Sequence, residues 1–170
     1  MRRRPLIVLG SAIVLTAAAT FWYVSRPALD PAREQAITTY FEQNHWGGKT
    51  GWFCEGQVIE VDQGRDESEV GFLAMCQQYS VTNGELHIDA GDFGPRLATV
   101  TSPPRPVEVL RVDAPGDGSR YAPWIEDNFS WYGTKKLHRV ERNAARTLDD
   151  ATAAKARKAY GLPADAPVGR

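Results

Sequence analysis

Several residue types are scarce in this sequence, and each scarcity excludes a class of protein. Only two cysteines occur in 170 residues, which excludes a disulfide-dense scaffold and a cysteine-rich zinc module. Basic and acidic residues nearly balance, at 20 against 21, so the chain has no globally basic surface for nucleic acid. With 42% hydrophobic and 24% charged residues, it is neither disordered nor a polytopic membrane protein. We expect one folded domain with an appendage.

Motifs for catalysis and for metal or phosphate binding are also missing. No G-x-S-x-G nucleophile elbow occurs. Gly47–Thr50 reads like the end of a phosphate loop, but Gln43 stands where that motif needs glycine, and a helix precedes it where a strand is required. The three histidines, His45, His87 and His138, have no metal-binding spacing. We therefore predict no catalytic residue, no cofactor and no metal ion.

The N-terminus carries the strongest positive signal. Three arginines precede an uncharged run over residues 6–24, which at 1.5 Å per residue is long enough to cross a bilayer of about 30 Å. The arginines predict a cytoplasmic N-terminus, and Phe21, Trp22 and Tyr23 suit the far interface. The alternative is a signal peptide cleaved after Ala19. Both interpretations place the rest of the chain outside the plasma membrane, and a retained anchor makes the lipid bilayer a partner through residues 6–24.

Beyond the anchor the charge is unevenly distributed. Residues 30–110 contain five basic and 13 acidic residues, whereas residues 111–170 contain 11 basic and eight acidic residues. We expect an acidic sheet followed by a basic C-terminal part. Four acidic residues follow one another closely between the first two predicted strands and are expected to form a solvated turn: Asp62, Asp66, Glu67 and Glu69.

The first predicted elements are a helix and a β-hairpin. Asp30 and Pro31 form a helix start, and Ile37 with Phe41 forms an apolar stripe, so a helix is expected over 31–45. Strands over 51–61 and 70–81 flank a polar turn. If Arg65 is the turn centre, Cys54 faces Cys76 directly, at the spacing a disulfide needs. An oxidising compartment favours that bond.

The second half of the chain predicts another hairpin, two strands and three helices. Asn83-Gly84 predicts a type I′ turn that pairs Val81 with Leu86 and Tyr79 with Ile88. Residues 90–95 are expected to interrupt the chain before strands over 96–101 and 107–112. Helices are expected over 121–129, over 134–145 and from a cap at Thr147 to Gly161.

This order of elements resembles the cystatin-like and nuclear-transport-factor-like α+β folds, in which a helix lies across a bent antiparallel sheet. The stretch from Asp117 to Phe129 is similar to a D-G-S-x-Y-x₃-I-x₃-F pattern of small exported bacterial proteins of uncharacterised function. The resemblance implies a fold and no activity, because such folds serve enzymes and binding modules alike.

The expected architecture is therefore α+β. It has an N-terminal transmembrane helix, one helix packed on a curved antiparallel sheet of about four or five strands, and C-terminal helices. We divide the chain into a cytoplasmic tail and signal anchor (1–26), an extracytoplasmic α+β domain (27–132) and a C-terminal helical extension (133–170).

Two functional hypotheses remain. The first is a non-catalytic module, anchored by a single membrane span, that binds an envelope or membrane protein, with Trp124 and Trp131 as candidate contact residues. The second is a small-ligand or isomerase-like pocket on a cone-shaped α+β fold. The best catalytic set for such a pocket is Tyr79, His87 and Asp89, but the predicted register places Tyr79 on the face opposite the other two.

Overall fold

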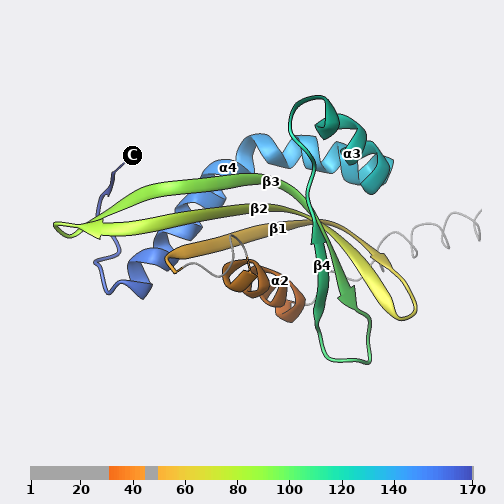
Figure 1. Ribbon diagram of the computed structural model, residues 1–170, viewed down its shortest axis with the longest axis horizontal. Helices are drawn as coiled ribbons and strands as arrows, with labels where there is room; N and C mark the ends of the chain where they lie inside the picture. The colour runs from red at the N-terminus through yellow and green to blue at the C-terminus, as the bar shows by residue number, and fades with distance from the viewer. Residues whose placement is uncertain (1–30, 45–49, 170) are drawn as a thin grey trace, which may run out of the picture. The chain divides into compact units, whose positions relative to one another are not determined.

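The computed structural model describes residues 31–44 and 50–169. This part of the chain is α+β, as the sequence predicts, with a mostly antiparallel sheet in the order β1-β2-β3-β4 and a short β5 that pairs with β3. Pro31–Arg170 forms one compact unit. One helix lies on the concave side of the bent sheet and a long helix lies across the opposite face (Figure 1).

Helix α2 (Pro31–Asn44) lies on the concave side of the sheet. Its stripe of apolar residues is buried as predicted, with Ile37 2% and Phe41 5% exposed. The Phe41 ring packs edge-to-face on Phe72 of the sheet, with ring centroids 5.4 Å apart. Aromatic pairs prefer this geometry, and it anchors the C-terminal turn of α2 against the sheet.

The first hairpin joins β1 (Trp52–Gln63) to β2 (Glu67–Thr82). The predicted register is confirmed from Trp52↔Gln78 to Val58↔Phe72, with Cys54 facing Cys76. A β-bulge between Val58 and Glu60 then shifts the pairing by one residue. A bulge adds one residue to one strand and bends that strand. The residues of the β1–β2 turn do not predict this bulge.

The second hairpin joins β2 to β3 (Glu85–Thr101) through the predicted Asn83-Gly84 turn. Asn83 has φ 54° and Gly84 has φ 81°, the left-handed values that a type I′ turn needs. The break expected at 90–95 was wrong, because β3 continues through it. Residues 88–96 pair with β2 on one side and with no described strand on the other, and a sheet edge of that kind tolerates Gly91, Gly94 and Pro95.

Short strands complete the sheet. β4 (Val109–Asp113) pairs antiparallel with the C-terminal part of β3, and β5 (Val168–Gly169) pairs parallel with its beginning. β4 starts two residues later and ends one residue later than the predicted strand over 107–112. The proline-rich stretch 102–106 connects β3 to β4.

The C-terminal helices cover the other face of the sheet. A short 3₁₀ turn (Gly118–Arg120) leads into α3 (Tyr121–Asn128), close to the expected range. The two helices expected after it are one, α4 (Trp131–Ala159). The expected cap at Thr147 was wrong: Thr147 is exposed within α4, and the buried stripe continues without a break through Ala144, Leu148 and Thr152.

One hydrophobic core of the described residues lies between the sheet and the pair α3 and α4. It contains eight buried apolar residues: Ile59, Leu73, Met75, Ile125, Phe129, Leu137, Ala144 and Leu148. Gly71 of β2 makes room for Phe129, since a Cβ atom there would stand 2.5 Å from the ring. The long helix is therefore part of the folded unit and contributes to its core.

Candidate partner-binding surface

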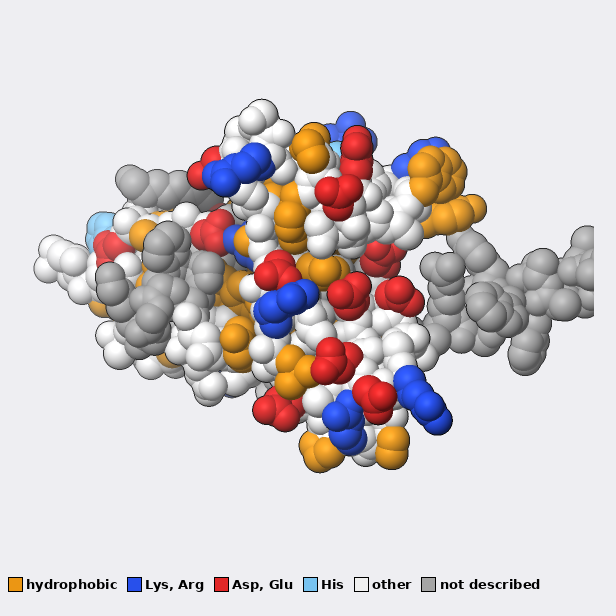
Figure 2. All heavy atoms as spheres, turned by 45° about the vertical axis from the view of Figure 1, so that its right-hand side comes forward, with side chains coloured by type: hydrophobic (Ala, Val, Ile, Leu, Met, Phe, Trp, Pro, Cys, Tyr) orange, Lys and Arg blue, Asp and Glu red, His pale blue; other side chains and the backbone are white. Residues whose placement is uncertain are grey.

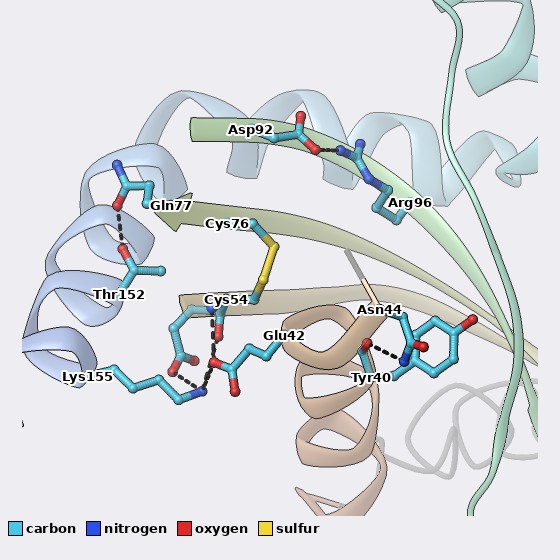
Figure 3. The surroundings of a disulfide bond; sticks show 11 residues. Tyr40, Glu42, Asn44, Cys54, Cys76, Gln77, Asp92, Arg96, Thr152 and Lys155 are labelled. Atoms are coloured by element: carbon cyan, nitrogen blue, oxygen red, sulfur yellow. Dashed lines mark hydrogen bonds and ion pairs between the residues drawn. A yellow bond between two sulfur atoms is a disulfide. The ribbon is translucent and has the colours of Figure 1, made fainter. Parts of the chain in front are cut away.

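The two cysteines form a disulfide in the described part of the chain. Cys54 and Cys76 are both 1% exposed, and their Cα atoms lie 4.1 Å apart across the β1–β2 pair. The bond faces the α2 side of the sheet (Figure 3). Buried and cross-strand, it has the setting of a structural disulfide.

Charged side chains cover the free edge of β1, the edge that pairs with no described strand. The Lys155 ammonium of α4 lies 2.7 Å from the Glu42 carboxylate of α2 and donates a hydrogen bond to the carbonyl of Cys54 (3.2 Å). Glu42 also accepts a hydrogen bond from the Cys54 N–H (3.0 Å). Lys136 donates to the carbonyls of Val58 and Ile59 at the bulge. Unpaired backbone N–H and C=O groups at a sheet edge can pair with an additional strand. The contacts above satisfy several of these groups on β1 with side-chain hydrogen bonds.

The candidate catalytic residues do not converge. Tyr79 points to the α4 side, where its hydroxyl lies 2.5 Å from Gln77 Oε1 and 3.2 Å from the Thr152 hydroxyl. Asp89 lies on the other face and accepts a hydrogen bond from Ser80 (2.9 Å). Ser80 is paired with His87, so the predicted separation of Tyr79 from these residues is confirmed. In the described residues, no three His, Cys, Asp or Glu side chains gather as metal ligands would.

The two tryptophans singled out from the sequence have different environments. Trp124 of α3 is half-buried and packs on Phe129, with ring centroids 6.0 Å apart. Trp131 of α4 is 63% exposed. Its neighbour Tyr132, which the sequence reading missed, is 59% exposed, and the two rings meet edge-to-face at 4.9 Å. Trp131 thus belongs to an exposed aromatic pair, whereas Trp124 supports the core.

Hydrogen bonds hold the first turn of α4, on which the Trp131–Tyr132 pair lies. The Ser130 side chain caps α4 by accepting a hydrogen bond from the Gly133 N–H (3.0 Å). Glu60 of β1 in turn accepts hydrogen bonds from the Ser130 N–H and hydroxyl, at 2.8 and 2.5 Å. The Lys135 ammonium lies 3.6 Å from the centre of the Trp131 ring, a cation–π contact. Figure 2 shows hydrophobic side chains protruding beside Lys or Arg side chains over this end of the molecule.

Basic residues extend the exposed surface along α4. We use the name aromatic–basic face for six exposed residues of this helix: Trp131, Tyr132, Lys135, Arg139, Arg142 and Arg146. From Trp131 the basic residues follow at steps of four, four, three and four, so they lie within about 80° of one another around the helix. The sequence prediction missed this face because it began the helix at residue 134, which left Trp131 and Tyr132 outside it.

The described residues also form an open groove on the α2 side of the sheet. Its volume is about 450 Å³, and it lies between α2 and the beginning of β4. Its polar lining includes Gln35, Thr39, Tyr40 and Glu108. Glu108 is the one acidic residue of this lining, so the groove has no pair of acidic groups for acid–base chemistry.

Two groups of the described residues have clearly shifted pKa values. Burial, together with the nearby negative charge of Glu55, raises the pKa of Glu34 in α2 above its usual range. Burial also raises the pKa of Tyr121 to about 12, and Glu141 adds to the shift because its carboxylate repels a phenolate and accepts the hydroxyl hydrogen bond (3.0 Å). Glu34 and Tyr121 lie on different helices, and neither lines the groove between α2 and β4.

Comparisons with protein families, with curated proteins and with solved structures found no match for this chain. Among the residues that the structure describes, no helix has the length and hydropathy of a membrane span. The predicted anchor at residues 6–24 lies outside those residues, as do His45 and most of the Gly47–Thr50 stretch.

Proposed function

We propose that this protein is a single-pass, membrane-anchored extracytoplasmic module, non-catalytic, that binds a protein or envelope component through the N-terminal end of α4. The observation that carries the proposal is the exposed Trp131–Tyr132 pair on a capped helix. Exposed aromatic residues on a rigid element are typical anchors of binding surfaces, because they bury a large area at low entropic cost.

The rest of the proposal is supported by the sequence and by the fold. The uncharged run over residues 6–24 after three arginines favours an anchor with a cytoplasmic N-terminus. A buried disulfide fits an oxidising compartment outside the plasma membrane. A helix on the concave side of a bent antiparallel sheet supports the cystatin-like or nuclear-transport-factor-like assignment, which by itself implies no activity (Figure 1).

Two measurements test the proposal. A C-terminal tag should be digested when intact cells or spheroplasts are treated with protease, and a protected tag would contradict the topology. A photo-crosslinking amino acid at position 131 should capture a partner in cells. The matched control is position 124, where the tryptophan packs on the core. Equal capture from both positions, or none from position 131, would contradict the assigned surface.

A small-ligand pocket is the second candidate, and the groove between α2 and β4 is the observation that favours it. Native mass spectrometry of the purified protein provides the test. A small molecule that is retained by the natural protein and lost from a Tyr40→Ala variant would favour the pocket over the binding module.

A further inference from the structure

We infer that the aromatic–basic face of α4 docks on the anionic headgroup surface of a lipid bilayer. The inference rests on the proposed function, because it names the envelope component that the face meets. Trp131 and Tyr132 would lie at the level of the headgroups, and the basic residues behind them would face the lipid phosphates.

Charge segregation is the first support. Between Trp131 and Arg146, α4 carries five basic residues and a single acidic one, Glu141. Glu141 is half-buried and accepts the hydrogen bond from Tyr121, so it is drawn toward α3. Within the described part of the chain, Lys135, Arg139, Arg142 and Arg146 form no salt bridge. Their charges remain available to an external anion.

The shape of the face is the second support. The row from Trp131 to Arg146 spans about 22 Å along one side of a straight helix. It lies on the exposed side of α4, and α4 covers the face of the sheet opposite the groove between α2 and β4 (Figure 1). A row of separate cations along a helix suits a broad, multivalent anionic surface better than one small ligand.

The aromatic pair is the third support, and it distinguishes a bilayer from other polyanions. Tryptophan and tyrosine are enriched at membrane interfaces, where an apolar ring and a polar group are both satisfied. Lys135 lies beside the Trp131 ring, so a positive charge for lipid phosphates and an aromatic ring for the membrane interface lie within about one helical turn of each other. Six residues separate the end of the predicted anchor, Val24, from Pro31, so a retained anchor would hold the face close to a bilayer at high effective concentration.

The experiment uses the full chain reconstituted into vesicles. One set contains phosphatidylcholine alone, and the other contains phosphatidylcholine and phosphatidylglycerol at seven to three. A photo-crosslinking amino acid replaces Trp131, and in a control chain it replaces Leu110, which is 43% exposed on β4. We expect lipid adducts from position 131 in the anionic vesicles, few in the neutral ones, and few from position 110 in either. High salt should reduce the adducts, because it screens exposed charges.

A charge-matched pair of variants isolates the role of the basic row. Arg139→Gln, Arg142→Gln and Arg146→Gln together should lower the docking equilibrium on the order of 100-fold, since each basic residue contributes about fivefold at an anionic surface. The control replaces Arg111, Arg120 and Lys158 by glutamine and has the same net charge. It should retain the adducts.

The outcomes separate the inference from the function on which it rests. Adducts that are equal from positions 131 and 110, insensitive to lipid charge, or unchanged by the triple Arg→Gln variant would overturn the inference. If position 131 captures a protein in cells and no lipid in vesicles, the inference fails while the proposed function stands. If position 131 captures lipid in vesicles but the C-terminal tag is protected from protease in cells, the lipid-docking inference stands and the proposed function is refuted.

Discussion

Lys155 of α4 and Glu42 of α2 meet at the free edge of β1, where Lys155 Nζ and Glu42 Oε1 lie 2.7 Å apart. The two helices cover opposite faces of the sheet, so this ion pair links both layers around the strand edge (Figure 3). Both groups also hydrogen-bond to the backbone of Cys54, and Glu55 lies 3.4 Å from Lys155. A single ammonium group therefore joins α2, β1 and α4.

Removing this ammonium should destabilise the domain modestly. Lys155→Met keeps most of the aliphatic stem, and we expect the free energy of unfolding to fall by about 1 kcal/mol, because the pair is partly solvated. Chemical denaturation measures the change. Lys158→Met, on an exposed position of the same helix, should change it by less than about 0.5 kcal/mol. A double-mutant cycle with Glu42→Gln that shows no coupling would contradict the linking role.

The disulfide should contribute more than the ion pair. In the chain-entropy treatment, a crosslink between residues 22 apart stabilises the folded state by about 3 kcal/mol. The double variant Cys54→Ala, Cys76→Ala should lower the free energy of unfolding by that amount. In the natural protein, two alkylatable thiols in the absence of reductant would contradict the bond.

Local chemistry made both hairpins predictable. The Asn83-Gly84 turn and the opposition of Cys54 and Cys76 determine register within a few residues of a loop, and both predictions are confirmed. The bulge near Ile59 and the continuity of β3 depend on tertiary packing and on which strand edge has a neighbour. Sequence periodicity does not contain that information.

The candidate surface was only partly predictable, for a related reason. Trp124 and Trp131 look alike in the sequence, but Trp124 lies on the side of α3 that faces the core, and Trp131 occupies the first turn of α4. The aromatic–basic face becomes visible only when the helix begins at Trp131, three residues before its predicted start at 134. The capping pattern at Thr147 suggested a boundary that the buried stripe overrides.

Gly133 should resist substitution even though it lies within a helix. A Cβ atom there would stand 2.3 Å from the Glu60 carboxylate, which binds Ser130. Alanine normally stabilises a helix by about 1 kcal/mol relative to glycine, so the sign of the change is diagnostic. We expect Gly133→Ala to destabilise the protein by about 1–3 kcal/mol in chemical denaturation. In a Glu60→Ala background the same change should cost less, and an equal cost in both backgrounds would contradict the clash.

Tyr121 should remain protonated well above the usual range of a tyrosine. With a pKa of about 12, about one-tenth of its hydroxyl is ionised at pH 11, against about nine-tenths for a tyrosine of pKa 10. The folded state holds this proton more tightly than the unfolded state. The resulting stabilisation is therefore fully present below pH 10 and is lost as the pH rises from about 10 toward 12.

The phenolate absorbance near 295 nm measures this ionisation, with Tyr121→Phe subtracted to isolate one of the six tyrosines. Glu141→Gln removes the negative charge beside the hydroxyl and should lower the pKa of Tyr121, although burial keeps it above the usual value. The matched control is Glu126→Gln, an exposed position of α3, which should leave the titration unchanged. If Glu141→Gln leaves the Tyr121 titration where it was, the contact between these two side chains does not contribute to the shift.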